Sequence, residues 1–129
     1  ITHDLGVVAR VCDRALIMYC GRIVEQAPIR RLFSQPRHPY TAGLMAALPQ
    51  LTRGSVQRVQ PIPGSVPSMN RRPPGCGFNN RCAHATDQCH TLEPTLQPGA
   101  AESHAVTDLQ IPQYACHHPL KQSLPADGP

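Results

Sequence analysis

The chain has 129 residues, and its twelve Lys and Arg against eight Asp and Glu give a formal net charge of +4 at pH 7. Its basic residues are scattered and only 4% of its residues are aromatic, so neither a basic face nor a base-stacking platform for nucleic acid is indicated. Its longest apolar stretch is far below the roughly 20 residues that a membrane-spanning helix requires. We therefore expect a protein that neither binds nucleic acid nor crosses a bilayer.

Composition changes at about Gln50. Eleven of the fifteen prolines follow this residue, and the remainder of the chain has few large aliphatic side chains. Its capacity to bury apolar surface is low, so something besides a hydrophobic core must order it. The chain opens with Ile-Thr-His-Asp rather than with methionine, which predicts a piece of a longer protein.

The N-terminal residues predict a strand end, a helix and a hairpin. Residues 1–2 read as the end of a buried strand, and Asp4 is suited to cap a helix that ends near Asp13. Two apolar runs, 15–19 and 22–26, predict antiparallel strands because a Cys-Gly pair between them favours a tight turn.

Prolines mark two further helices. Pro28 suits the first turn of a helix that runs through Phe33, and Pro39 suits the start of another that ends before Pro49. Beyond that helix the sequence predicts no further helix or strand. We expect 121–129 to be a disordered tail.

His3 lies between the predicted strand end and the predicted helix. A lone histidine is usually structural or exposed, but its surroundings are specific. Ile-Thr-His-Asp-Leu, a helix, an apolar strand and Tyr-Cys-Gly-Arg-Ile-Val-Glu at 19–25 resemble the end of an ABC transporter nucleotide-binding domain, from its switch histidine onward. The resemblance implies that His3 contacts the terminal phosphate of ATP and helps to hold the attacking water. A neutral imidazole suits that role because it can donate to an oxygen that gains charge.

The resemblance covers only the end of that domain. The chain has no Gly-rich phosphate loop, no signature motif and no acidic strand for magnesium. We therefore expect ATP hydrolysis, with ATP and Mg as ligands, to belong to an intact subunit and this chain alone to be inactive.

Cys76, Cys82, Cys89 and Cys116 form the second pattern, with five, six and twenty-six residues between successive members. Two disulfides, or thiols packed as small hydrophobes, are alternatives to a metal site. A reducing compartment disfavours the first, and the poorly apolar surroundings disfavour the second. Thiolates bind both zinc and iron-sulfur clusters, and the absence of short Cys-x2-4-Cys spacings favours the larger cluster.

The segment Leu-Phe-Ser-Gln-Pro-Arg-His-Pro-Tyr-Thr at 32–41 resembles the His-Pro-Tyr region that follows the ABC domain in oligopeptide and dipeptide importers. The cysteine-containing segment resembles the cysteine-rich tail of the same family. The resemblance implies that the four cysteines ligate a 4Fe-4S cluster, as in at least some members. It also implies that His38 and Tyr40 are structural residues.

Other residues near this site have alternative interpretations. A histidine could replace one cysteine as ligand, and His90 is the favoured candidate because it adjoins Cys89; the others are His84, His117 and His118. Cys12 and Cys20 are expected to be ordinary, partly buried residues.

Together these patterns predict an α/β fragment, in which the end of an ABC ATPase domain (helix, β-hairpin, helices) precedes a loop-rich, cysteine-ligated extension. The expected boundaries are 1–36 for the ATPase end and 37–120 for the extension. The family implies coupling of ATP hydrolysis to peptide import from the cytoplasmic face of the membrane. It also implies a second ATPase subunit, transmembrane permease subunits and, indirectly, a peptide-binding protein as partners. Alternatives are a small zinc-binding interaction module and a redox-sensing regulatory module.

Overall fold

The computed structural model describes residues 1–48, 51–52, 55–56, 61–99 and 111–121. They form an α/β fragment with a four-stranded and a two-stranded sheet. In chain order the elements are α1 (Leu5–Val11), β1 (Arg14–Tyr19), β2 (Arg22–Pro28), α2 (Ile29–Ser34), α3 (Pro39–Ala46), β3 (Leu51–Thr52), β4 (Ser55–Val56), α4 (Asp87–Thr91), β5 (Gln97–Pro98) and β6 (Gln113–Tyr114), with 3-10 turns at Met69–Arg71 and Asn79–Arg81. Within these described ranges no helix is long and apolar enough to cross a membrane.

The predicted cap of α1 is present, whereas the predicted strand before it is not. The Asp4 carboxylate accepts hydrogen bonds from the backbone N–H groups of Gly6 and Val7, at 2.9 and 3.1 Å. Residues 1–2 form no strand, and Ile1 is fully exposed. The strand prediction was wrong for this chain because a strand needs a neighbour for its backbone groups, and none of the described strands pairs there.

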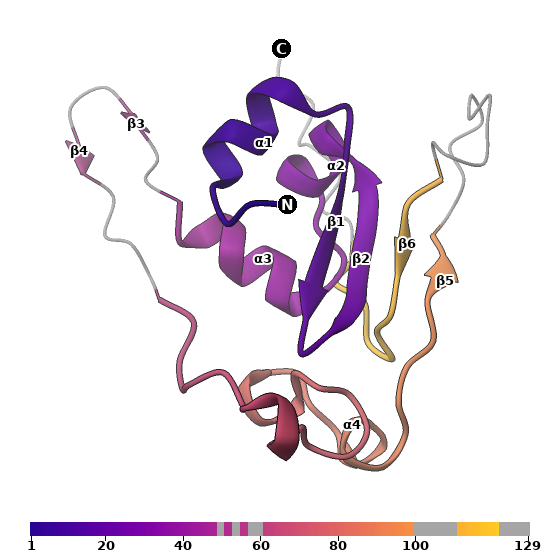
Figure 1. Ribbon diagram of the computed structural model, residues 1–129. Coiled ribbons are helices and arrows are strands. Elements are labelled where there is room, and N and C mark those ends of the chain that lie inside the picture. The colour runs from indigo at the N-terminus through magenta and orange to yellow at the C-terminus, as the bar shows by residue number, and fades with distance from the viewer. Residues whose placement is uncertain (49–50, 53–54, 57–60, 100–110, 122–129) are drawn as a thin grey trace.

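The predicted hairpin forms between β1 and β2. Cys20 and Gly21 connect the strands with φ of 45° and 74°, the left-handed values that a tight primed turn requires at both positions. The sheet then extends in the order β1-β2-β6-β5, so β2 is an inner strand. Figure 1 shows β6 and β5 beside the hairpin, while α4 lies in the loop-rich part at the bottom of the view.

One hydrophobic core joins the two halves of the chain. Ile17, Val24 and Leu32 are buried in it, and Phe78 of the cysteine-containing segment is 3% exposed in the same cluster. The ring of Tyr19 packs at 5.2 Å, centroid to centroid, edge-on against Phe78. The second half of the chain is therefore attached to the hairpin by aromatic packing as well as by β6.

A buried carboxylate on β2 holds the start of α3. Glu25 is 1% exposed, and its two oxygens accept hydrogen bonds from the backbone N–H groups of Arg37 and His38, both at 2.8 Å. Burial raises the pKa of Glu25, and these hydrogen bonds act in the opposite direction. The contact fixes the chain between α2 and α3 on the inner strand of the sheet.

His38 caps α3 from an equally buried position. Its Nδ1 accepts a hydrogen bond from the backbone N–H of Tyr40 at 3.0 Å, and Pro39 occupies the first turn, as predicted. His38 is 1% exposed, and burial lowers the pKa of its imidazole to about 4. Because Nδ1 is an acceptor, the neutral ring carries its proton on Nε2.

The low pKa of His38 predicts a specific acid sensitivity. Unfolded chains bind this proton below about pH 6.5, whereas the folded protein binds it only near pH 4, so lowering the pH through this window favours unfolding. In the metal-free chain, wild type should lose up to about 3 kcal/mol of stability relative to His38→Asn between these pH values. Urea unfolding at several pH values measures the difference.

The comparison isolates His38 because Glu25, whose raised pKa has the opposite effect on stability, is present in both chains. Asn is also a good helix cap. Parallel stability curves for the two chains from pH 7 to pH 4 would contradict the prediction.

A cysteine-lined pocket as candidate functional site

Backbone contacts hold together the two segments that carry Cys76 and Cys89. The Cys76 N–H donates to the Cys89 carbonyl at 2.8 Å. The buried Asn79 side chain donates to the same carbonyl at 3.2 Å and to the Pro74 carbonyl at 2.7 Å. Gly75 allows this approach because it has φ of +71° and because a Cβ there would meet the Cys89 carbonyl oxygen at 2.4 Å.

The four cysteines selected from the sequence line one small pocket. Cys76 precedes the 3-10 turn at Asn79–Arg81, Cys82 follows it, Cys89 lies in α4, and Cys116 follows β6. The other residues of the lining are His38, Pro39, Phe78, Asn79, His84, His117 and His118. All four thiols are free, and the cavity measures about 10 Å³, roughly the room that one water requires.

Burial and mutual proximity affect the thiols of this pocket. The pKa of Cys116 is raised to about 11, chiefly by burial, and the other three cysteines add to the effect. Burial also raises the pKa values of Cys76 and Cys82. The thiols of Cys76, Cys82 and Cys116 are therefore protonated at neutral pH, and any metal that binds them must displace these protons.

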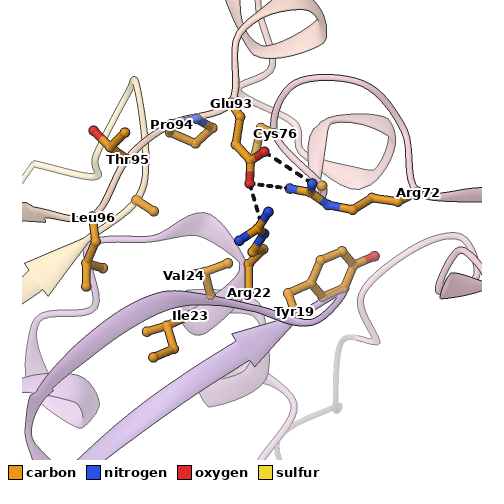
Figure 2. A pocket seen from close by; sticks show the side chains of 12 residues that line it. Tyr19, Arg22, Ile23, Val24, Arg72, Cys76, Glu93, Pro94, Thr95 and Leu96 are labelled. Atoms are coloured by element: carbon orange, nitrogen blue, oxygen red, sulfur yellow. Dashed lines mark hydrogen bonds and ion pairs between the residues drawn. The ribbon is translucent and has the colours of Figure 1, made fainter.

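Cys76 also lines a wider groove, which has a volume of about 430 Å³. Figure 2 shows the Glu93 carboxylate between two guanidinium groups. It is 2.8 Å from Arg72 and 3.3 Å from Arg22 of β2, and the hydrogen bond from Arg72 lowers the pKa of Glu93. Arg22 and Glu93 are substantially exposed and Arg72 is partly buried, so the ion pairs position the chain after α4 more than they stabilise it.

Residues 24–89 match the family described as oligopeptide/dipeptide transporter, C-terminal region, over just over half of the chain. The chain belongs to this family. The matched residues run from β2 to α4 and include three of the pocket cysteines, Cys76, Cys82 and Cys89. The family thus covers both the Glu25 contact and most of the pocket.

Named relatives agree with this assignment. The chain is 48% identical over 96 residues to the oligopeptide transport ATP-binding protein AppD of Bacillus subtilis, covering 74% of the chain and 29% of that protein. It is 50% identical over 104 residues to the probable peptide ABC transporter ATP-binding protein y4tR of Sinorhizobium fredii, covering 78% and 31%. It is 48% identical over 105 residues to the oligopeptide transport ATP-binding protein OppD of Mycobacterium tuberculosis, covering 81% and 17%. The chain spans less than a third of the length of each relative.

The pocket presents thiols, a type of donor that both iron-sulfur clusters and zinc accept. Four thiols line it, and among the described residues no carboxylate does. Across the same residues, no three Cys, His, Asp or Glu side chains are arranged to hold a single metal ion. Because the cavity has room for about one water, the thiols would have to move apart to admit a cluster.

The histidines near the cysteines differ in their placement. His90, the favoured replacement ligand, is exposed on α4 and is absent from the pocket lining. His118 Nε2 is hydrogen-bonded to the Thr86 hydroxyl at 2.8 Å, and His117 Nε2 to the Leu92 carbonyl at 2.8 Å. His84 lines the pocket but is exposed.

His3 and the two remaining cysteines lie outside the pocket. His3 is exposed just before α1. Cys12 and Cys20 are partly buried, as expected, and Cys20 packs against the hydrophobic core. Asn79 was not recognised from the sequence, because nothing distinguishes it there from the adjacent Asn80.

The close approach at Gly75 predicts a strong effect of one methyl group. Gly75→Ala should destabilise the chain by about 2 kcal/mol or more, because the left-handed backbone is strained for alanine and the methyl group meets a carbonyl. Thermal unfolding measures the loss. Gly77→Ala is the matched control, since Gly77 does not have the left-handed backbone of Gly75 and a Cβ there would meet side-chain atoms of Arg72 at 3.3 Å and of Cys20 at 3.4 Å, with no backbone carbonyl in the way. Equal melting temperatures for the two variants would contradict the prediction.

Proposed function

We propose that this chain is the C-terminal part of the ATP-hydrolysing subunit of a peptide importer, with an iron-sulfur cluster held by four cysteines. The observation that carries the proposal is that the four cysteines line one pocket and that three of them lie within the family match. The three relatives named above, all described as ATP-binding proteins of peptide transport, support the transporter assignment.

Residues 1–36 are the end of the ATPase domain in this proposal, and 37–120 are its extension. His3 contacts the terminal phosphate of ATP in the intact subunit and helps to orient the attacking water. Its position supports this role, because it is exposed and adjoins the capped start of α1. Mg and the rest of the phosphate-binding machinery come from other parts of the subunit, so this chain alone does not hydrolyse ATP.

The intact subunit acts at the cytoplasmic face of the membrane as a peripheral protein. Its partners are a second ATPase subunit, the permease subunits that form the translocation path and, through them, a peptide-binding protein. The family resemblance supports these assignments. The cargo is selected by other subunits.

Cys76, Cys82, Cys89 and Cys116 are the ligands of the cluster. When bound, the cluster supplies iron-thiolate bonds and a redox-active centre. The chain itself supplies the Cys76–Cys89 backbone hydrogen bond and the Asn79 side chain, which hold two of the ligand segments in register before any metal binds. The role is structural, because the bonds join segments that have little core of their own.

Metal and acid-labile sulfide analysis tests the cluster. The chain purified without oxygen should contain about four iron and four sulfide, with a brown absorption spectrum. Cys116→Ser should lose most of this iron because it removes a pocket ligand. Cys12→Ser is the matched control, since Cys12 is a partly buried cysteine outside the pocket, and it should retain the iron.

Two results would contradict the cluster assignment. Zinc at about one per chain without sulfide would identify a structural zinc module instead. Equal iron loss in Cys116→Ser and Cys12→Ser would show that the pocket is not the binding site.

The role of His3 is tested in the intact subunit. His3→Ala should lower ATP hydrolysis at least about 100-fold, because a hydrogen bond to charge that develops in the transition state is lost. Binding of ATP should be nearly unchanged. Asp4→Asn is the control, since asparagine preserves the helix cap next to His3. Near-normal turnover of His3→Ala would refute the assignment.

A further inference from the structure

The wider groove beside β2 contains charges that do not balance. Among the described residues that line it, Arg22 and Arg72 are the only basic ones and Glu93 is the only acidic one. Two guanidinium groups therefore share one carboxylate, as Figure 2 shows, and one positive charge is left over. A group with a single negative charge would complete the set.

The positive charge that is left over belongs mainly to Arg22. Both Nη atoms of Arg72 donate hydrogen bonds to the Glu93 oxygens, at 3.3 and 2.8 Å. Arg22 approaches the same carboxylate with its Nε, at 3.3 Å. Within the described parts of the chain, no hydrogen bond engages the two Nη atoms of Arg22, so the end of its guanidinium fork is available to an acceptor.

Glu93 also restrains Arg22 before any ligand binds. An arginine side chain on a protein surface loses rotamer entropy when it is ordered by a ligand. Here the ion pair with Glu93 already holds the guanidinium of Arg22 at the wall of the groove, although the side chain is 66% exposed. An acceptor that binds the Nη atoms keeps the Nε contact and has less ordering to offset.

The rest of the groove is suited to an apolar group. Its volume of about 430 Å³ lies in the range of small-molecule sites. Aliphatic side chains of β2 and of the segment after α4 line it, and in the view of Figure 2 Val24 lies between Leu96 and Arg22. Leu96 is 38% exposed, so an apolar ligand would cover surface that the fold leaves open to water.

The balance of charge favours a carboxylate over a phosphate. Both groups fit the planar fork of an arginine. A phosphate monoester carries about two negative charges at neutral pH, whereas the groove has one positive charge to offer. The second negative charge of a phosphate would lie near Glu93 and be repelled by it.

We propose that this groove binds a small organic monocarboxylate, whose oxygens accept hydrogen bonds from the Nη atoms of Arg22 and whose apolar body covers Val24 and Leu96. The ligand connects β2 to the segment after α4. The inference goes beyond the proposed function and does not depend on it, since neither the cluster nor His3 takes part in this binding.

Two probes of nearly the same shape test the binding. Isocaproate carries the carboxylate, and isocaproamide replaces it with a neutral amide. Each is titrated into the 129-residue chain at neutral pH and low salt, and the backbone amide NMR shifts of residues 22–24 and 95–96 are followed. Isocaproate should cause saturable shifts there, with an affinity at least about 10-fold above that of the amide, because a charged acceptor strengthens the hydrogen bonds from Arg22.

A pair of variants locates the site. Arg22→Gln should weaken isocaproate binding at least about 10-fold, because it removes the charged fork. The side chain is largely exposed, so the variant should fold, which its melting temperature checks. Arg10→Gln is the matched control, since it removes the same charge from an exposed residue of α1 outside the groove lining, and it should bind as wild type does.

Three results would overturn the inference. Shifts of wild type that grow linearly with isocaproate would show that there is no site. Equal affinities for the two probes would show that the groove recognises apolar surface alone, and this comparison needs only wild type. Equal weakening in Arg22→Gln and Arg10→Gln would identify a general effect of net charge. None of these results bears on the cluster, which metal analysis tests separately.

Discussion

The buried carboxylate of Glu25 is the contact on which the arrangement of this chain depends. Removing a carboxylate from water is costly, and the cost is offset here because both of its oxygens receive backbone hydrogen bonds. Those donors belong to Arg37 and His38, so the contact sets the direction in which α3 leaves the sheet. Since Glu25 also pairs with Tyr114 of β6, one residue places three parts of the chain around the pocket.

The described residues of the second half pack against the first half and have no separate core. Phe78 is buried in the core of the hairpin, and β6 pairs with the edge of β2 that β1 leaves free. Glu93 forms an ion pair with Arg22. Each contact is small, and each uses a residue of the first half as its partner. The loop-rich composition after Gln50 is therefore compatible with a defined pocket, because order is supplied from outside the segment.

Local signals made the first half of the fold predictable. The Asp4 cap, the turn at Cys20 and the start of α3 at Pro39 depend on neighbouring residues, and the structure contains all three. β6 was not predicted because two residues leave no periodic pattern and their partner lies far away along the chain. The cysteines could be selected by residue type alone. The placement of His38 beside them could not, since it depends on how α3 docks.

Two contacts close the loop between Cys89 and Cys116: the pairing of β6 with β2, and the meeting of the two cysteines in the pocket. Cys89 and Cys116 lie in the same pocket, and Cys116 follows directly after the residues that pair with β2. The segment between these cysteines is thus brought back to the body of the protein twice, once by strand pairing and once at the pocket. The entropy lost on closing a loop is lost only once, so either closure makes the other easier. Strand addition and assembly of the cysteine-lined pocket are therefore two steps of one cooperative event.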